Sequence, residues 1–252
     1  MKAIITGASS GIGKDMAKYL SELGYDLVLV ARREERLKEL KNKLKTNVEV
    51  VPLDLEKEEN CYKLYEQYKD EKIDVFINNA GFGLFGDFID TSLDRELEMI
   101  NLNVKALHIL TKLFIQKMDK QKSGYILNVA SSAGFLAGPR LSTYYATKNY
   151  VLKLTMAIYH ELKRRKSKVV ISALCPGPVD TEFNKVAEGK FKIDGASSWY
   201  VAKYAIDKLF QKKLLIIPKF SVKLAIFLSR LTPYKILLSI TDKIQYRKNR
   251  GM

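Results

Sequence analysis

At 252 residues, of which 47% are hydrophobic, the chain is long enough to bury one sizeable core, as α/β domains of this length commonly do. Only Cys61 and Cys175 are present, far apart in the sequence, which argues against a disulfide framework and against a cysteine-rich metal motif. The net charge of +15 is concentrated near the end, where ten Lys or Arg and one acid from Lys212 onward contribute +9; because no recognition motif accompanies it, nucleic-acid binding is not expected.

Short apolar runs alternate with longer amphipathic stretches along residues 1–218. The runs are rich in Val, Ile and Leu without strict polar alternation, which is typical of parallel strands covered by helices on both faces. The predicted strands are residues 3–6, 26–31, 48–53, 75–78, 125–130, 169–174 and 214–217. The predicted helices include residues 12–23, 34–44, 94–120, 143–166 and 199–210. This order predicts an α/β fold with a doubly wound, Rossmann-type parallel sheet of about seven strands and right-handed crossovers.

Residues 1–218 show no repeat and no interdomain linker, so we expect one catalytic domain that binds a cofactor. The first predicted strand follows the first residues directly, without a charged leader or an apolar signal segment. We therefore expect a cytoplasmic protein. His108 and His160 lie in predicted helices without partners at metal-ligand spacing, so no metal site is expected.

A glycine-rich turn, residues 6–13, joins the first predicted strand to the first helix. Gly7 permits the tight turn, Gly11 lets the backbone approach a pyrophosphate, and Gly13 lets helix and strand pack closely. The helix N-terminus then offers unpaired N–H groups and a partial positive charge to phosphates. The turn therefore predicts a dinucleotide site. Its other expected contacts are Ser9, Ser10 and Ile12.

The residues after the second strand indicate which dinucleotide binds. A site that selects NAD usually has a carboxylate here for the ribose 2′-hydroxyl, but this chain has Ala31 followed by Arg32 and Arg33. A guanidinium can bind a 2′-phosphate through charge-assisted hydrogen bonds. NADPH is therefore the predicted cofactor, with Arg32 the first candidate for the phosphate contact and Arg33 the second. The alternative is a basic surface at a helix start, although cations are disfavoured there unless an anion is near.

The turn spacing T-G-x-x-x-G-x-G resembles that of the NADP-dependent short-chain dehydrogenase/reductase family. Further motifs follow in the family's order, up to about residue 218: Asp54-Leu55, Asn78-Asn79-Ala80-Gly81, Asn103, Ser131, Tyr144-x-x-x-Lys148 and Pro176-Gly177-Pro178-Val179-Asp180-Thr181. The resemblance implies that Asp54 binds the adenine and that Val179 and Thr181 hold the nicotinamide carboxamide. The residues that it implies for the rest of the cofactor site are Leu55, Asn79, Ala80, Gly81, Pro176 and Gly177.

Tyr144 and Lys148 provide the predicted proton-transfer site. Tyrosine has an ordinary pKa of about 10, so a nearby cation is needed to favour the phenolate near neutral pH. Four residues apart on one helix, the two side chains share a face, and we expect the Lys148 ammonium, with the positive nicotinamide, to lower the pKa of Tyr144. Tyr145 is rejected because its i+4 partner is the uncharged Asn149 and its side chain points about 100° away.

Ser131 completes the predicted catalytic group, at the carboxyl end of the fifth strand, where its hydroxyl can donate to a carbonyl oxygen. Ser132 competes for this role, but the resemblance places the reactive serine thirteen residues before the tyrosine, at Ser131. For Asn103 the resemblance implies a water-mediated proton relay through Lys148. Asn101 is the alternative in that helix, where Asn is otherwise merely tolerated.

The expected reaction is hydride transfer between the nicotinamide and a small carbonyl or alcohol substrate, with Tyr144 as the general acid and base. The alternative is a module that binds NADPH without turnover and responds to redox state through its interactions, since a fold alone does not fix function. The intact set of Asn103, Ser131, Tyr144 and Lys148 argues against this alternative. The resemblance also implies a homo-oligomer.

Residues 179–198 form the longest stretch without a clear apolar period, and they follow a strand at the ligand-binding edge of the sheet. We interpret them as a mobile substrate lid, because loops of this length are uncommon unless they are functional. An ordinary surface loop is the alternative.

Residues 219–252 are predicted to form a basic, amphipathic, helical C-terminal extension of the same domain. In the first helix, which Thr232-Pro233 ends, one apolar stripe consists of Leu224, Phe227, Leu228 and Leu231. The second segment has an apolar stripe of Leu237, Ile240 and Ile244, accompanied by Lys243, Arg247, Lys248 and Arg250. Neither segment is long or uncharged enough to span a bilayer, but such a hairpin is typical of a peripheral contact with an anionic membrane surface. The alternative is that the apolar stripes pack on the body or on a partner subunit.

Overall fold

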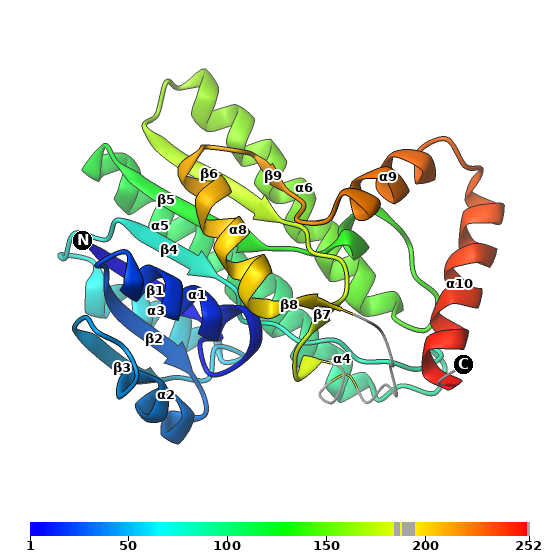
Figure 1. Cartoon of the computed structure of the whole chain (residues 1–252), viewed down its shortest axis with the longest axis horizontal. Coiled ribbons are helices and arrows are strands. Elements are labelled where there is room, and N and C mark those ends of the chain that lie inside the picture. Colours follow the sequence, from blue (N-terminus) through cyan, green and yellow to red (C-terminus); the bar gives the residue numbers. More distant parts are fainter. Residues whose placement is uncertain (184–186, 188–194, 251–252) are drawn as a thin grey trace.

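A parallel sheet of seven strands runs through the middle of the molecule (Figure 1). The computed structural model describes residues 1–183, 187 and 195–250, apart from the side chains of residues 247–250. The strand order is β3-β2-β1-β4-β5-β6-β9, and every neighbouring pair is parallel. The strands are β1 (Lys2–Thr6), β2 (Asp26–Ala31), β3 (Val48–Pro52), β4 (Val75–Asn78), β5 (Gly124–Val129), β6 (Val169–Leu174) and β9 (Leu215–Ile216). The predicted doubly wound, Rossmann-type fold is confirmed.

Alternate residues of each strand face opposite sides of this sheet, because the side-chain period of a strand is two. In β1, Ile5 packs in the layer that contains α1, α2 and α8, and Ile4 packs in the layer that contains α3, α5 and α6. In the second layer, Phe76 of β4 stacks on Phe114 of α5, with ring centroids 4.0 Å apart. The helices are α1 (Gly11–Glu22), α2 (Glu34–Lys41), α3 (Glu58–Tyr68), α5 (Leu107–Gln121), α6 (Ser142–Arg164) and α8 (Ser198–Phe210).

Helix α3 was not among the helices that the sequence pattern identified. Its apolar face is short, since only Cys61, Leu64 and Tyr68 are buried, at i, i+3 and i+7. The rest of the helix is charged or polar, so its periodicity is weak over a single window. Its acidic first turn, Glu58 and Glu59, suits the N-terminal end of a helix.

The long helix predicted for residues 94–120 is interrupted. It consists of α4 (Leu93–Ile100), a π-helical turn (Asn101–Ala106) and α5. π-helical turns are rare inside helices and occur frequently at functional sites. Here the turn contains Asn103, which is completely buried.

The stretch predicted as a loop, residues 179–198, contains two short strands that pair with each other in parallel. They are β7 (Val179–Asp180) and β8 (Ala196–Ser197), and β8 leads directly into α8. Most of the predicted lid between them, residues 184–186 and 188–194, lies outside the described residues. Short paired strands therefore stand at the two ends of the segment, and its role as a substrate lid stays a prediction.

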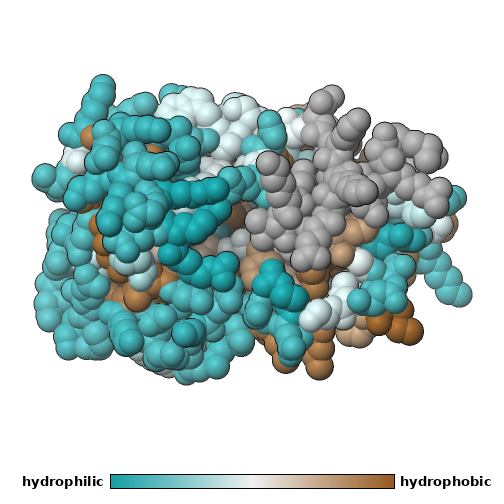
Figure 2. Space-filling view, turned by 90° about the horizontal axis from the view of Figure 1, so that it is seen from below, coloured by the Kyte–Doolittle hydropathy of each residue, from teal (hydrophilic) through white to brown (hydrophobic). Residues whose placement is uncertain are grey.

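The C-terminal residues form two helices, as the sequence predicted, α9 (Phe220–Ser229) and α10 (Tyr234–Arg250). Helix α10 packs on the body through polar groups: the Arg140 Nε–Asp242 Oδ1 distance is 3.0 Å, and Gln245 Nε2 donates to the Tyr145 hydroxyl at 2.8 Å. The predicted apolar stripe of α9 lies outward instead, with exposed fractions from 48% for Leu224 to 70% for Leu231. Figure 2 shows apolar residues at the surface on the right of its view, the end where α9 and α10 lie in Figure 1.

Candidate active site

The carboxyl ends of the central strands border one cleft with a volume of about 450 Å³. Nearly every residue that the sequence predicted for cofactor binding or catalysis lines it. The two exceptions are Gly13 and Asn103, which support the wall from behind. Their places follow from the topology, because parallel strands bring their carboxyl ends to the same edge of a sheet.

The glycine turn and the Asn79-Ala80 segment form one wall of the cleft. Gly7 and Gly11 both have positive φ, of 66° and 53°, which disfavours side chains. A Cβ on Gly13 would lie 2.5 Å from the Gly7 carbonyl oxygen, so only glycine allows α1 to start this close to the turn. The Asn79 side-chain amide donates to the carbonyl oxygens of Thr6 and Gly7, at 3.0 and 3.2 Å.

This wall fits a pyrophosphate group. The turn presents bare backbone, because a Cβ on any of its three glycines would crowd neighbouring protein atoms, and α1 begins with Ser10 as its N-cap, whose side chain makes no capping hydrogen bond. This side chain therefore leaves the first N–H groups of α1 uncapped. The positive end of the helix dipole lies at the same place. Thr6, which the sequence analysis did not single out, links the two segments of this wall. Its hydroxyl oxygen accepts from the N–H groups of Asn79 and Ala80 at 2.9 and 3.0 Å.

Tyr144, Lys148 and Ser131 meet at the other end of the cleft. Tyr144 and Lys148 lie in the first turns of α6, and the Lys148 Nζ atom is 5.8 Å from the centroid of the Tyr144 ring. The Lys148 ammonium donates to the Val129 carbonyl oxygen, at 2.9 Å. Ser131 caps the short 3-10 helix Ser132–Phe135 by accepting from the Ala133 N–H at 3.1 Å. Its hydroxyl also forms a hydrogen bond with the Tyr144 hydroxyl, inside the cleft.

The electrostatics of this group differ from the sequence-based expectation of a lowered tyrosine pKa. Burial raises the pKa of Tyr144 to about 12, although a hydrogen bond with the Ser131 hydroxyl acts in the opposite direction. That expectation includes the positive nicotinamide and stays a prediction. In the chain alone the pKa is raised because the phenolate would lose its hydration, while the Lys148 ammonium is directed at the Val129 carbonyl. Burial also lowers the pKa of Lys148 to about 8. At neutral pH, both groups are therefore mainly protonated.

Asn103 holds the loop beside the catalytic group. Its side-chain oxygen accepts from the Phe82 N–H at 3.0 Å, and its amide donates to the Phe82 carbonyl oxygen and the Thr147 hydroxyl at 2.8 and 3.1 Å. A Cβ on Gly81 would lie 2.7 Å from Asn103 Oδ1 and 3.5 Å from Lys148 Nζ, so Gly81 separates the two side chains. Asn103 thus positions Phe82 and Thr147, and its proton relay through Lys148 stays a prediction.

Comparison with known proteins agrees with this geometry. A family model described as short chain dehydrogenase matches residues 1–190. The chain belongs to the short-chain dehydrogenase/reductase family. It is 37% identical to an uncharacterized oxidoreductase of Staphylococcus epidermidis over 182 residues, which is 71% of this chain and 78% of that one. As a member of this family, the protein is an oxidoreductase.

Two solved structures illustrate the likeness in three dimensions. A short-chain dehydrogenase from Sphingobium yanoikuyae in complex with NADPH has a TM-score of 0.79 and 28% sequence identity, over 87% of this chain and 88% of that chain. A short-chain dehydrogenase/reductase from Burkholderia phymatum in complex with NAD has a TM-score of 0.84 and 24% identity, over 91% and 92% of the two chains. The second likeness shows the shared fold alone.

The end of the cleft at Tyr144 contains residues that the sequence analysis missed. The Phe183 ring lies 5.2 Å from the Tyr144 ring, centroid to centroid, and Gln245 of α10 lines the cleft with its amide on the Tyr145 hydroxyl. Tyr145 therefore lines the wall beside Tyr144, and its rejection as the catalytic tyrosine stays a prediction. Phe183 follows the Thr181 motif and could have been found from that position, whereas Gln245 stands in a basic helix without any sequence signal.

Proposed function

We propose that this protein is an NADPH-dependent oxidoreductase that interconverts a carbonyl and an alcohol, with Tyr144 as the general acid and base. The observation that carries the proposal is the arrangement of one continuous cleft. A glycine turn and two arginines line one end of it, and Tyr144, Lys148 and Ser131 meet at the other. Such a cleft suits a dinucleotide along its length and a small substrate at the catalytic end.

In this proposal, different residues around the cleft bind different parts of the cofactor. The glycine turn and the start of α1 hold the pyrophosphate, Asp54 holds the adenine, and arginines after β2 hold the 2′-phosphate. Val179 and Thr181 hold the nicotinamide carboxamide. When bound, the reduced nicotinamide supplies the hydride.

The protein's own groups then act on the substrate oxygen. The Ser131 hydroxyl donates a hydrogen bond to it and stabilises the negative charge that develops there. Tyr144 donates its phenolic proton to the same oxygen in the direction of reduction and recovers a proton in the direction of oxidation. The raised pKa of Tyr144 keeps this proton in place at neutral pH, and the Lys148 ammonium is the cation on the same face of α6.

Replacing the tyrosine tests the proposed chemistry. Tyr144→Phe should reduce kcat to less than about a tenth, which corresponds to a barrier increase of more than ~1.4 kcal/mol, because the ring remains and the proton donor is lost. NADPH binding, measured by quenching of protein fluorescence, should remain. Tyr145→Phe is the matched control and should stay active, since the Tyr145 hydroxyl is hydrogen-bonded to Gln245. Full activity of Tyr144→Phe, or NADPH binding by the parent protein without reduction of any carbonyl in a broad panel, would contradict the proposal.

We further propose that α9 and α10 rest on an anionic membrane surface and bring the cleft to a lipophilic carbonyl substrate. The supporting observation is the orientation of α10. This helix buries the polar Thr241 and Gln245 against the body and exposes the apolar Ile236, Ile240 and Ile244. Apolar residues exposed next to cations are typical of interfacial helices. No helix within the described ranges is long and apolar enough to cross a membrane.

Vesicle flotation tests whether a membrane or a partner subunit covers this surface. The protein, cytoplasmic in this proposal, should float with vesicles that contain anionic lipid at low salt and should bind neutral vesicles less. The double variant Phe227→Gln, Leu231→Gln should bind less, whereas Tyr62→Gln, at an exposed aromatic residue of α3, should not. If the parent protein does not float and the double variant dissociates a homo-oligomer instead, the surface is a subunit interface.

A further inference from the structure

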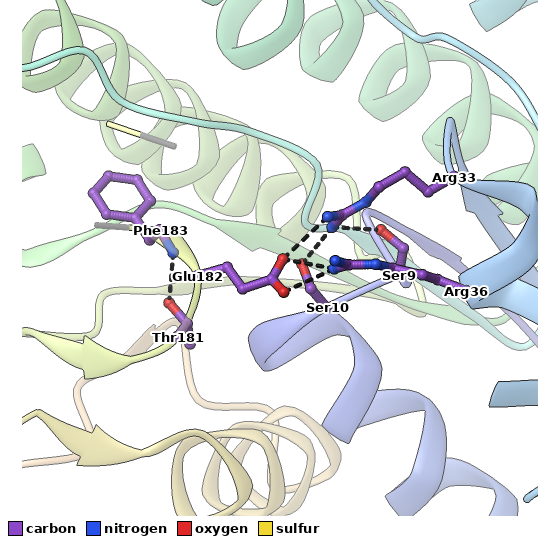
Figure 3. Close-up of polar contacts among 7 residues, drawn as sticks. All are labelled: Ser9, Ser10, Arg33, Arg36, Thr181, Glu182 and Phe183. Carbon is purple, nitrogen blue, oxygen red and sulfur yellow. Dashed lines mark hydrogen bonds and ion pairs between the residues drawn. The ribbon is translucent and has the colours of Figure 1, made fainter. Parts of the chain in front are cut away.

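Two arginines at the start of α2 meet a glutamate from the opposite rim of the cleft (Figure 3). The Glu182 carboxylate accepts from Arg33 Nη1 at 3.1 Å and from Arg36 Nη1 at 2.7 and 2.8 Å. Glu182 is the second residue after β7, 149 residues after Arg33 in the chain. The three side chains therefore form an ionic bridge across the mouth of the cleft.

The glycine turn contributes to the same cluster. Arg33 Nη2 donates to the hydroxyls of Ser9 and Ser10, at 3.1 and 3.0 Å, so its guanidinium lies between the phosphate-binding turn and Glu182. Cations near a helix N-terminus are unfavourable unless an anion is close, and Glu182 supplies that anion. The two arginines hold the pKa of Glu182 below its ordinary value, with Arg36 the larger cause.

Arg32, the first candidate from the sequence, is engaged elsewhere. Its guanidinium Nη1 atom pairs with Glu56 Oε1 at 2.9 Å, on the same rim of the cleft. Arg33, the second candidate, contacts the turn directly, and Arg36 stands beside it although no sequence motif singled it out. Two guanidinium groups thus bind one carboxylate, and one of them is also held by two hydroxyls (Figure 3).

We propose that Arg33 and Arg36 are the site for the 2′-phosphate of NADPH and that the Glu182 carboxylate occupies this site until the phosphate displaces it. The inference rests on the proposed NADPH dependence and adds a specificity-determining pair, Arg36 and Glu182. A phosphate monoester carries up to two charges and three acceptor oxygens, so it binds two guanidinium groups better than a carboxylate does. NADH has no such group, so it leaves Glu182 on the arginines.

The phosphate can displace the carboxylate because all three side chains are exposed to solvent. The exposed fractions of the Arg33, Arg36 and Glu182 side chains are 44%, 43% and 40%. Exposed ion pairs add little to folding stability, since water screens them and the side chains lose rotamer freedom. The bridge can therefore open without loss of the fold, and substitutions at these positions test binding rather than stability.

Binding of small adenine nucleotides tests the inference without turnover. Titration calorimetry compares adenosine 2′,5′-bisphosphate, which carries the 2′-phosphate, with adenosine 5′-phosphate, which lacks it. Glu182→Gln removes the competing charge and should tighten the bisphosphate about tenfold, whereas Arg36→Gln should weaken it about tenfold. Neither variant should change the affinity for adenosine 5′-phosphate by more than about twofold.

Glu35→Gln is the matched control. Glu35 precedes Arg36 in α2 and carries the same charge as Glu182, but its side chain is 84% exposed and pairs with Lys38, with 3.8 Å between the charged atoms. Equal effects of Glu182→Gln and Glu35→Gln would show that the competition does not occur, and unchanged bisphosphate binding by Arg36→Gln would exclude Arg36. If the parent protein and Glu182→Gln both bind the two nucleotides equally, the NADPH dependence itself is wrong. If Arg32→Gln alone specifically weakens bisphosphate binding, the 2′-phosphate site is at Arg32.

Discussion

Lys148→Met should abolish turnover and, at neutral pH, stabilise the fold. Burial lowers the Lys148 pKa from 10.5 to about 8, a difference that corresponds to a destabilisation of roughly 3 kcal/mol while the lysine is charged. The variant also loses the hydrogen bond to the Val129 carbonyl oxygen, which costs about 1 kcal/mol. The net gain is therefore about 2 kcal/mol, or an increase of about 4–8 °C in Tm for a chain of this length.

The pH dependence of this gain follows from proton binding. Between pH 8 and 10.5, Lys148 binds fewer protons in the folded than in the unfolded chain, so its unfavourable contribution fades as the pH rises through this window. Urea unfolding of both proteins at pH 7 and at pH 10 should show the difference in unfolding free energy shrinking at the higher pH. Lys43→Met, at an exposed position, controls for the lost charge and should change stability by less than about 0.5 kcal/mol. A Lys148→Met protein that is less stable than the parent at pH 7, or equally shifted at both pH values, would refute this reasoning.

Two further predictions concern the interior. Phe114→Ala should lower the unfolding free energy by about 3–5 kcal/mol in urea titrations, because the ring is fully buried and stacks on Phe76; a loss below about 1 kcal/mol would contradict this packing. Burial raises the thiol pKa values of Cys61 and Cys175 to about 12, so a thiol reagent at pH 8 should leave the native protein unlabelled and react with both cysteines in urea. Labelling of the native protein at the unfolded rate would show that these thiols are exposed.

The sequence by itself determined where the strands lie and how the local motifs of the site are spaced. Continuous apolar runs place the strands, because parallel strands are buried on both faces, and the seven predicted runs are the seven strands of the sheet. The three glycines of the turn and the four-residue spacing of Tyr144 and Lys148 are local properties of the backbone. For that reason, the structure places these residues as the pattern predicts.

Only the tertiary structure decided the properties that depend on burial and on distant partners. In the chain alone, the pKa of Tyr144 is raised because desolvation is the largest effect and the Lys148 ammonium is directed at the Val129 carbonyl, and no spacing in the sequence reveals that balance. Arg33 rather than Arg32 faces the glycine turn because of the backbone direction at the start of α2 and because of a glutamate 149 residues away. Likewise, α10 turns its polar side inward because Arg140 and Tyr145 provide polar partners there. Local patterns report the short-range preferences of the chain, whereas these choices arise from contacts that exist only after the sheet has assembled.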